Sequence, residues 1–156
     1  MSDIIEAVTP QQVAQVRNLF VDYRRQLPLD YCFQTFDAEI AGLPGDYAPP
    51  RGMLLLATVV GQPVGCVGLR PFPLAATCEM KRLYVRPGLR GGNLGRLLVE
   101  RLLNEARVLG YKSMRLDSYR PRMQAAIALY RSFGFREIPP DPLQPTEGLI
   151  YMELAL

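Results

Sequence analysis

The sequence predicts an α/β fold: a mixed, mainly antiparallel sheet flanked by about four helices. Segments with strand-like and helix-like apolar periodicity follow one another in the order β-α-α-β-β-β-α-β-α-β-β. The 156 residues suffice for a single domain, spanning residues 1–156, with a substantial core. The composition, 49% apolar and 21% charged, is that of an ordinary globular protein rather than a membrane or disordered one.

The N-terminal part predicts one strand and two helices. "DIIEAV" (3–8) is a short strand rich in β-branched residues. Thr9 is a suitable N-cap, and Pro10 suits the first position of a helix that runs to about Gln26. "DYCFQTFDAEIAGL" (30–43) predicts a second helix.

The middle of the chain predicts a loop, a β-hairpin, a further strand that follows the hairpin, and a long helix. "PGDYAPPRG" (44–52) is a loop by its proline and glycine content. The hairpin covers 53–72 and turns at Gly61-Gln62-Pro63, and "TCEMKRLYV" (77–85) is the next strand. Apolar residues at helical spacing then begin at Leu94, and the helix ends near Gly110, a plausible C-cap.

The C-terminal part predicts a strand, a helix and two further strands. "KSMRLDS" (112–118) is a strand, and "PRMQAAIALYRSF" (121–133) is a helix followed by Gly134. "FREI" (135–138) and "LIYMELAL" (149–156) are the last two strands, separated by a proline-rich loop.

The turn "RGGNLGR" (90–96) joins a strand to a helix and predicts an anion site. A helix start carries unpaired N–H groups and a partial positive charge, to which phosphate groups bind when the backbone is accessible. The glycines remove side chains that would block the approach, and the arginines add charge-assisted bonds. The turn has neither the Walker A nor the dinucleotide glycine pattern, and a plain strand–turn–helix corner is the alternative interpretation.

The residue inventory excludes several chemistries. The chain has no histidine, so it has neither a histidine-based catalytic triad nor a His-ligated metal site, and we expect no metal. Cys32, Cys66 and Cys78 lack metal-type spacing, and without histidine to activate them we expect core thiols. The N-terminus shows no secretory signal and no apolar run approaches a membrane span, which favours a cytoplasmic protein without a membrane partner.

Charge is unevenly distributed along the chain. Residues 20–50 carry five acids against two bases, whereas residues 81–122 carry eleven bases against three acids. Such a basic half suggests an anionic partner. We considered a nucleic-acid binder, but no basic recognition helix with exposed aromatics is evident, and we expect no nucleic-acid partner.

Two motifs give the sequence a family resemblance. "RGGNLG" after a strand ending in "YV" resembles the Arg/Gln-x-x-Gly-x-Gly/Ala pyrophosphate loop of the GNAT superfamily of acyl-CoA N-acyltransferases. "AIALYRSFGF" (126–135) resembles the second signature of that superfamily, and the order of elements matches over essentially the whole chain. The resemblance implies an N-acetyltransferase that passes an acetyl group from acetyl-CoA, its co-substrate, to a primary amine in a ternary complex.

The resemblance also implies where the co-substrate lies. The sheet should open in a V-shaped splay between strands 77–86 and 112–118, with the pantetheine arm along Leu83, Tyr84 and Val85. The pyrophosphate should sit on the turn formed by Arg90, Gly91, Gly92, Asn93, Leu94, Gly95 and Arg96.

Two catalytic residues are expected. A lysine-like amine has a pKa of about 10.4, so a general base should help the attack. Glu79 lies eleven residues before Arg90, the offset of the glutamate base in the histone-modifying branch of the superfamily; a solvated, ion-paired carboxylate is the alternative interpretation. Tyr130 matches the family tyrosine that approaches the thioester sulfur, and a phenol can protonate the leaving thiolate.

Other residues leave alternatives open. Met123 stands where the family often has asparagine, which weakly favours a non-catalytic acyl-CoA-binding or sensing module on the same fold. Asp117 could bind substrate or act as a local cap. Tyr23, Tyr31 and Phe33 could line an acceptor site, although aromatics at these spacings are more often core. The acidic stretch would suit a cationic small-molecule or protein amine as acceptor, and the resemblance is compatible with a homodimer.

Overall fold

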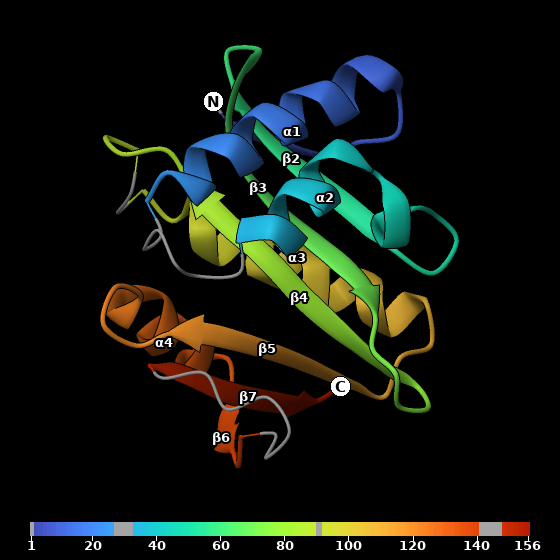
Figure 1. The fold of residues 1–156 in the computed structure, drawn as a ribbon, viewed down its shortest axis with the longest axis vertical. Coiled ribbons are helices and arrows are strands. Elements are labelled where there is room, and N and C mark those ends of the chain that lie inside the picture. The colour runs from blue at the N-terminus through green and yellow to red at the C-terminus, as the bar shows by residue number, and fades with distance from the viewer. Residues whose placement is uncertain (1, 27–32, 90–91, 141–147) are drawn as a thin grey trace.

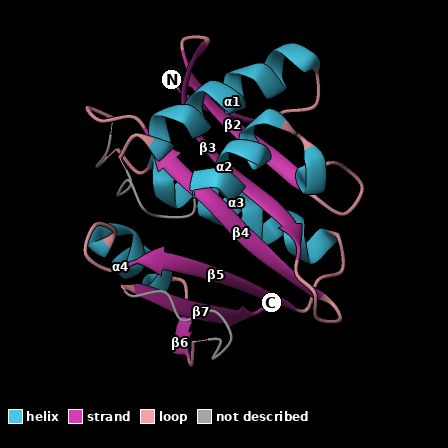
Figure 2. Ribbon diagram, in the orientation of Figure 1, coloured by secondary structure: helices cyan, strands magenta, loops and turns pink. Residues whose placement is uncertain are grey.

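The structure, a computed structural model, describes residues 2–26, 33–89, 92–140 and 148–156. They form one seven-stranded sheet with helices on both faces (Figures 1 and 2), in the strand order β1-β2-β3-β4-β5-β7-β6. Every pair of neighbouring strands is antiparallel except β4 and β5. The predicted fold class is therefore confirmed. The strands are β1 Ser2–Glu6, β2 Met53–Val59, β3 Gln62–Pro71, β4 Thr77–Val85, β5 Ser113–Tyr119, β6 Arg136–Ile138 and β7 Leu149–Ala155, and the α-helices are α1 Pro10–Arg24, α2 Phe33–Ala41, α3 Leu94–Val108 and α4 Gln124–Ser132.

The sheet buries apolar residues on both faces. In β2, Leu54 and Leu56 point toward a core formed with α1 and α2, whereas Leu55 and Ala57 point toward a second core with α3 and α4. This alternation follows from the two-residue period of a strand, and it explains why β2 reads as a continuous apolar run. Figure 1 shows α1 and α2 in front of the sheet and α3 behind it.

The helix boundaries follow local signals in the sequence. Thr9 caps α1: its hydroxyl accepts from the Gln12 N–H at 3.1 Å, and the Gln12 side chain accepts from the Thr9 N–H at 3.1 Å. Gly110 follows α3 at φ +92°, the left-handed conformation expected of a C-cap glycine. Within the described parts of the chain, no helix is long and apolar enough to cross a membrane.

The segment 44–52, expected to be a loop, contains the short 3-10 helix Gly45–Tyr47. This turn buries the Tyr47 ring, which is 2% exposed, against β3. A Cβ on Gly68 would lie 2.6 Å from that ring, so β3 needs glycine there. The Tyr47 hydroxyl thereby comes within hydrogen-bonding distance of Glu39, 2.9 Å away.

β4 and β5 separate after a short paired stretch. Their parallel ladder runs from Thr77–Ser113 to Glu79–Arg115 and ends there, although both strands continue for several residues. Between Lys81 and Tyr84 the register of β4 against β3 shifts by one residue, and Arg82 in this bulge has φ +62°. A bulge bends its strand and increases the local twist. The bend carries β4 away from β5, so the two strands diverge toward their C-terminal ends (Figure 1).

Candidate active site

A cavity of about 650 Å³ lies between the end of β4, the start of α3 and α4. Six of the predicted co-substrate residues line it, three from the end of β4 and three from the start of α3. They are Leu83, Tyr84, Val85, Asn93, Gly95 and Arg96. Residues ten positions apart in the sequence thus share one wall, as the strand–turn–helix arrangement predicted. The opposite wall comes from Arg122 and α4, and the end of α1 closes the cavity.

The remaining turn residues have different positions. Leu94 is 5% exposed and packs in the core between α3 and the sheet. Gly92 is exposed and is not among the residues that line the cavity. Arg90 and Gly91 lie outside the described residues, so their predicted contacts are not placed by the structure.

The N-terminus of α3 borders the cavity, and no side chain in the described parts of the chain caps it. Asn93, the N-cap residue, adopts φ +68° and its side chain makes no capping hydrogen bond. The first N–H groups of the helix and the positive end of its dipole are therefore available for an anion. Arg96 stands beside them, held by a hydrogen bond to the Ser132 hydroxyl at 3.2 Å and by the face of Phe133.

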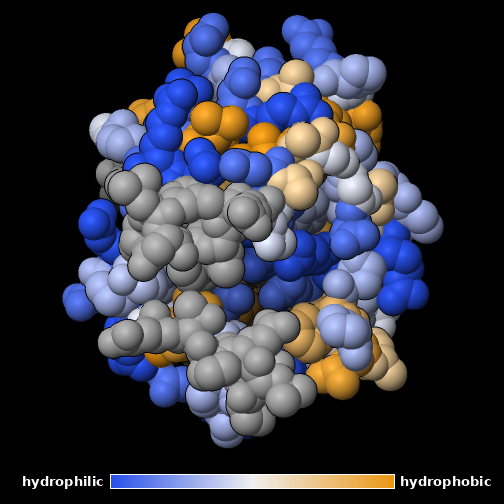
Figure 3. Space-filling model, in the orientation of Figure 1, coloured by the Kyte–Doolittle hydropathy of each residue, from blue (hydrophilic) through white to orange (hydrophobic). Residues whose placement is uncertain are grey.

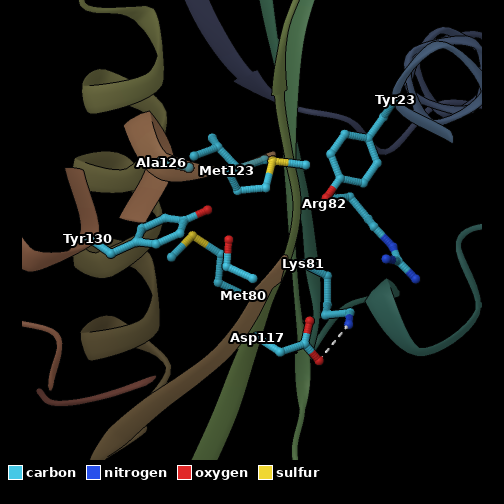
Figure 4. Close-up of a pocket in the computed structure, with 10 residues that line it drawn as sticks. Tyr23, Met80, Lys81, Arg82, Asp117, Met123, Ala126 and Tyr130 are labelled. Atoms are coloured by element: carbon cyan, nitrogen blue, oxygen red, sulfur yellow. Dashed lines mark ion pairs between the residues drawn. The ribbon is translucent and has the colours of Figure 1, made fainter. Parts of the chain in front are cut away.

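A second, much smaller cavity of about 30 Å³ lies deeper in the opening (Figure 4). It shares Tyr23, Leu83, Met123 and Ala126 with the larger cavity, so the two adjoin. Its volume is that of roughly one water molecule or one ammonium group. Its remaining lining residues are Met80, Lys81, Arg82, Asp117, Ser118 and Tyr130.

Tyr130 is placed on α4 with its hydroxyl directed into the small cavity (Figure 4). The ring is 7% exposed and packs edge-on against Phe135. Burial, followed by the nearby Tyr23 and Asp117, raises the pKa of the Tyr130 hydroxyl well above its usual value. A raised pKa keeps the Tyr130 hydroxyl protonated throughout the physiological range.

Glu79 lies on the paired part of β4, before the strands diverge. Its carboxylate accepts from Arg70 Nε at 3.0 Å and lies 4.0 Å from Lys81 Nζ. It is 9% exposed and lines neither of the two cavities. The structure therefore places Glu79 in an ion pair with Arg70, one strand position below the opening, and leaves its role as a base untested.

Ionic side chains cover the face of the sheet on which Glu79 lies. Arg82 donates to Glu39 of α2 at 2.9 and 3.0 Å, and Tyr47 donates to the same carboxylate at 2.9 Å. Arg115 pairs with Glu153 at 2.8 Å. Figure 3 shows hydrophilic side chains gathered in the middle of this face. Acids from other parts of the chain thus neutralise several bases of segment 81–122, which weakens the case for a nucleic-acid surface.

Tyr23 and Met123 line both cavities. Tyr23 comes from the end of α1, and burial raises the pKa of its hydroxyl to about 12, although Arg82 acts to lower it. Figure 4 shows its hydroxyl and that of Tyr130 directed inward from opposite sides. Met123 places a thioether where the family often has an amide, so this wall is apolar.

Neither of the two described cysteines, Cys66 and Cys78, lines the site. Cys66 and Cys78 are fully buried in the two cores. Burial raises the pKa of the Cys78 thiol to about 12, and it raises that of Cys66 further. Because the thiolate is the nucleophile, neither can form an acyl-enzyme at neutral pH. Cys32 lies outside the described residues, and among those that are described no cluster of three metal-ligating side chains occurs.

Comparisons with known proteins agree with this geometry. Residues 13–135 match the acetyltransferase (GNAT) family. An uncharacterized N-acetyltransferase of Schizosaccharomyces pombe is 39% identical over 148 residues, which cover 94% of this chain and 90% of that protein. A GNAT-family acetyltransferase of Staphylococcus aureus superposes with a TM-score of 0.82 at 18% identity, covering 99% of each chain. An N-acetyltransferase of Thermoplasma acidophilum, solved in complex with coenzyme A, has a TM-score of 0.78 at 16% identity, covering 100% of this chain and 99% of that one.

The match over most of the chain, the extensive identity to a named N-acetyltransferase and the opening between β4 and β5 all lead to one assignment. This chain belongs to the GNAT family of acetyltransferases.

Proposed function

We propose that the protein transfers an acetyl group from acetyl-CoA to a primary amine by direct attack in a ternary complex. One observation carries this proposal: a large cavity at the start of α3 adjoins a small one that holds Tyr130. The first suits an extended, phosphate-bearing co-substrate. The second suits an amine beside a proton donor. The coenzyme A in the Thermoplasma acidophilum relative supports the same use of the fold.

The larger cavity fits coenzyme A in its chemistry. The uncapped start of α3 and Arg96 would hold the pyrophosphate by N–H donors and positive charge. The ladder between β4 and β5 ends at Glu79–Arg115, and residues 83–85, which line the cavity, would lie along the pantetheine arm. Arg90 and Gly91 are proposed to complete the phosphate site.

Residues that border the small cavity are proposed to supply the groups that acetyl transfer to an amine needs. A new C–N bond forms while the C–S bond breaks, and the departing thiolate must be stabilised or protonated. We propose that the Tyr130 hydroxyl performs that task and that a carboxylate on the sheet face removes a proton from the amine. Glu79 is one proposed base. Its carboxylate is paired with Arg70 and lies beside Lys81, which borders the small cavity.

Charge reversal at Arg96 tests the co-substrate site. The Arg96→Glu variant should bind acetyl-CoA about tenfold more weakly or worse, because a phosphate-binding cation becomes an anion, and tenfold corresponds to about 1.4 kcal/mol. Isothermal titration calorimetry at matched salt measures the affinity. Arg107→Glu makes the same charge change in the last turn of the same helix, away from both cavities, and should bind like wild type. Failure of the folded wild-type protein to bind acetyl-CoA would refute the proposal.

A side chain added at Gly95 tests the shape of the cavity. A Cβ there would meet only Leu129 Cδ2, at an ordinary 3.7 Å, so the protein itself does not require glycine. Valine should fill part of the cavity and weaken acetyl-CoA binding at least tenfold, while thermal stability stays near wild type because valine is a better helix residue than glycine. Leu97→Val, on the outward side of α3, is the control. Unchanged affinity in Gly95→Val would place the co-substrate elsewhere.

A further inference from the structure

We infer that Asp117 binds the amine of the acceptor and accepts its proton. This inference rests on the proposed acetyl transfer and assigns its base. Among the described residues, Asp117 is the only carboxylate that lines either cavity. It projects from β5 two residues past Arg115, where pairing with β4 ends, and so lies inside the opening.

The carboxylate of Asp117 retains free acceptor capacity. Its one charged partner among the described residues is Lys81, with Nζ 3.6 Å from Oδ2, beyond hydrogen-bonding distance. The other carboxylates on this face hold closer partners: Arg70 for Glu79 at 3.0 Å, Arg115 for Glu153 at 2.8 Å, and Arg82 and Tyr47 for Glu39 at 2.9 Å. An ionised carboxylate offers about four lone-pair sites, and those of Asp117 remain open to a ligand.

The dimensions of the small cavity suit a single nitrogen. Its volume of about 30 Å³ accommodates one amine head group or one water molecule. Asp117 and Tyr130 both border it, and the charge of Asp117 helps to raise the pKa of the Tyr130 hydroxyl. A nitrogen placed there would have a proton acceptor and a proton donor beside it. This is the arrangement that an amine attacking a thioester requires.

Lys81 gives the site a preference for the neutral amine. Its ammonium lies beside Asp117 in the same cavity (Figure 4). A second positive charge at that place is disfavoured, so the pKa of an acceptor ammonium bound there is lowered and it gives up its proton to Asp117 more readily.

The protons and bonds balance in this scheme. An acceptor that arrives as R–NH3⁺ gives one proton to Asp117, which later releases it to solvent. The nitrogen then attacks the thioester carbonyl, the C–N bond forms and the C–S bond breaks. The second proton leaves the nitrogen and replaces the one that Tyr130 donates to the thiolate. The products are the N-acetyl amide, coenzyme A as free thiol and one proton.

Thiol release with a panel of primary amines tests the assignment. The panel contains spermidine, lysine, kanamycin and phenethylamine, each with acetyl-CoA, and the best acceptor is used for all variants. Asp117→Asn should lose at least tenfold in kcat/KM for the amine and retain the wild-type acetyl-CoA Kd, which also reports a folded site. Asp117→Glu, which keeps the carboxylate, should recover part of the activity. Glu153→Gln removes a carboxylate from the same face outside the cavities and should behave like wild type.

The outcomes separate the inference from the function beneath it. Asp117→Asn within threefold of wild type overturns the assignment and leaves acetyl transfer intact, and a large loss in Glu79→Gln would then identify Glu79 as the base. If wild type binds acetyl-CoA but releases no thiol with any amine of the panel, the proposed acetyl transfer to amines fails. The assignment of Asp117 then fails with it.

Discussion

Replacing Tyr130 with phenylalanine should lower kcat for acetyl transfer about 100- to 1,000-fold, the contribution expected of a positioned general acid. The acetyl-CoA Kd should remain within a factor of three, because the lost hydroxyl acts on the departing thiolate and not on the bound co-substrate. Burial raises the pKa of this hydroxyl, so wild type should show no loss of the proton donor up to about pH 10. Steady-state thiol release across pH 6–9.5 measures kcat and its pH dependence, and isothermal titration calorimetry measures the acetyl-CoA Kd.

A loss of activity in this variant should not come from unfolding. Among the described residues the Tyr130 hydroxyl has no hydrogen-bond partner, and the ring contact with Phe135 survives in phenylalanine. The free energy of unfolding should therefore change by less than about 1 kcal/mol. A kcat within threefold of wild type would contradict the assigned role. A protein that binds acetyl-CoA without turnover, in both forms, would instead be the non-catalytic sensing module that Met123 weakly favours.

Replacing Arg82 with methionine should reduce the free energy of unfolding by about 3–5 kcal/mol, the cost of leaving a buried charge without its partner. The Arg82 and Glu39 side chains are each 11% exposed, and the guanidinium binds both carboxylate oxygens. It also stacks on Phe36, with Cζ 3.9 Å from the ring centroid. Urea denaturation at pH 7 measures the loss. Arg115→Met, which breaks a half-exposed pair with Glu153, should cost about 1 kcal/mol or less.

The same pair makes stability depend on pH. Burial alone would raise the pKa of Glu39, but the hydrogen bonds and charge of Arg82, with help from Tyr47 and Arg70, outweigh it and lower that pKa below its usual value. A depressed pKa in the folded state stabilises the protein above the unfolded value of about 4.3, and this contribution disappears as pH falls through the folded value. Glu39→Gln should therefore flatten the decline in stability below about pH 4.5. An unchanged acid limb would contradict the pair's role.

Local signals made most of the element boundaries predictable. The Thr9-Pro10 start and the Gly110 end lie within a residue or two of the observed helix termini, because caps depend on the residues at the boundary itself. The position of β7 between β5 and β6 did not follow from the sequence. Strand order depends on pairing between distant segments, for which the single sequence offers no measure. The proline-rich segment 44–52 contains a buried aromatic turn because Tyr47 finds space over Gly68 in the folded sheet.

The sequence also located the candidate site, but it did not show how the individual residues are arranged there. The stretch 83–96 was located by motif, and the structure adds which of its residues line the cavity: Asn93 and Gly95 do, whereas Leu94 packs in the core. The spacing of Tyr23 favoured a place in the core. Its position at the cavities depends on how α1 packs against the sheet, which the sequence does not reveal. The importance of Asp117 relative to Glu79 depends on the point at which β4 and β5 diverge. The bulge at Arg82 that governs this has no marker in a strand otherwise rich in regular β-formers.

The divergence of β4 and β5 also bears on aggregation. Interrupting a sheet creates two inner edges whose N–H and C=O groups could template another strand, a known hazard of exposed edges. Here Tyr23 of α1 and Met123 beside α4 line both cavities at the gap and narrow the access of another strand to the inner edges. The outer edges are short, five residues in β1 and three in β6, which limits pairing there as well.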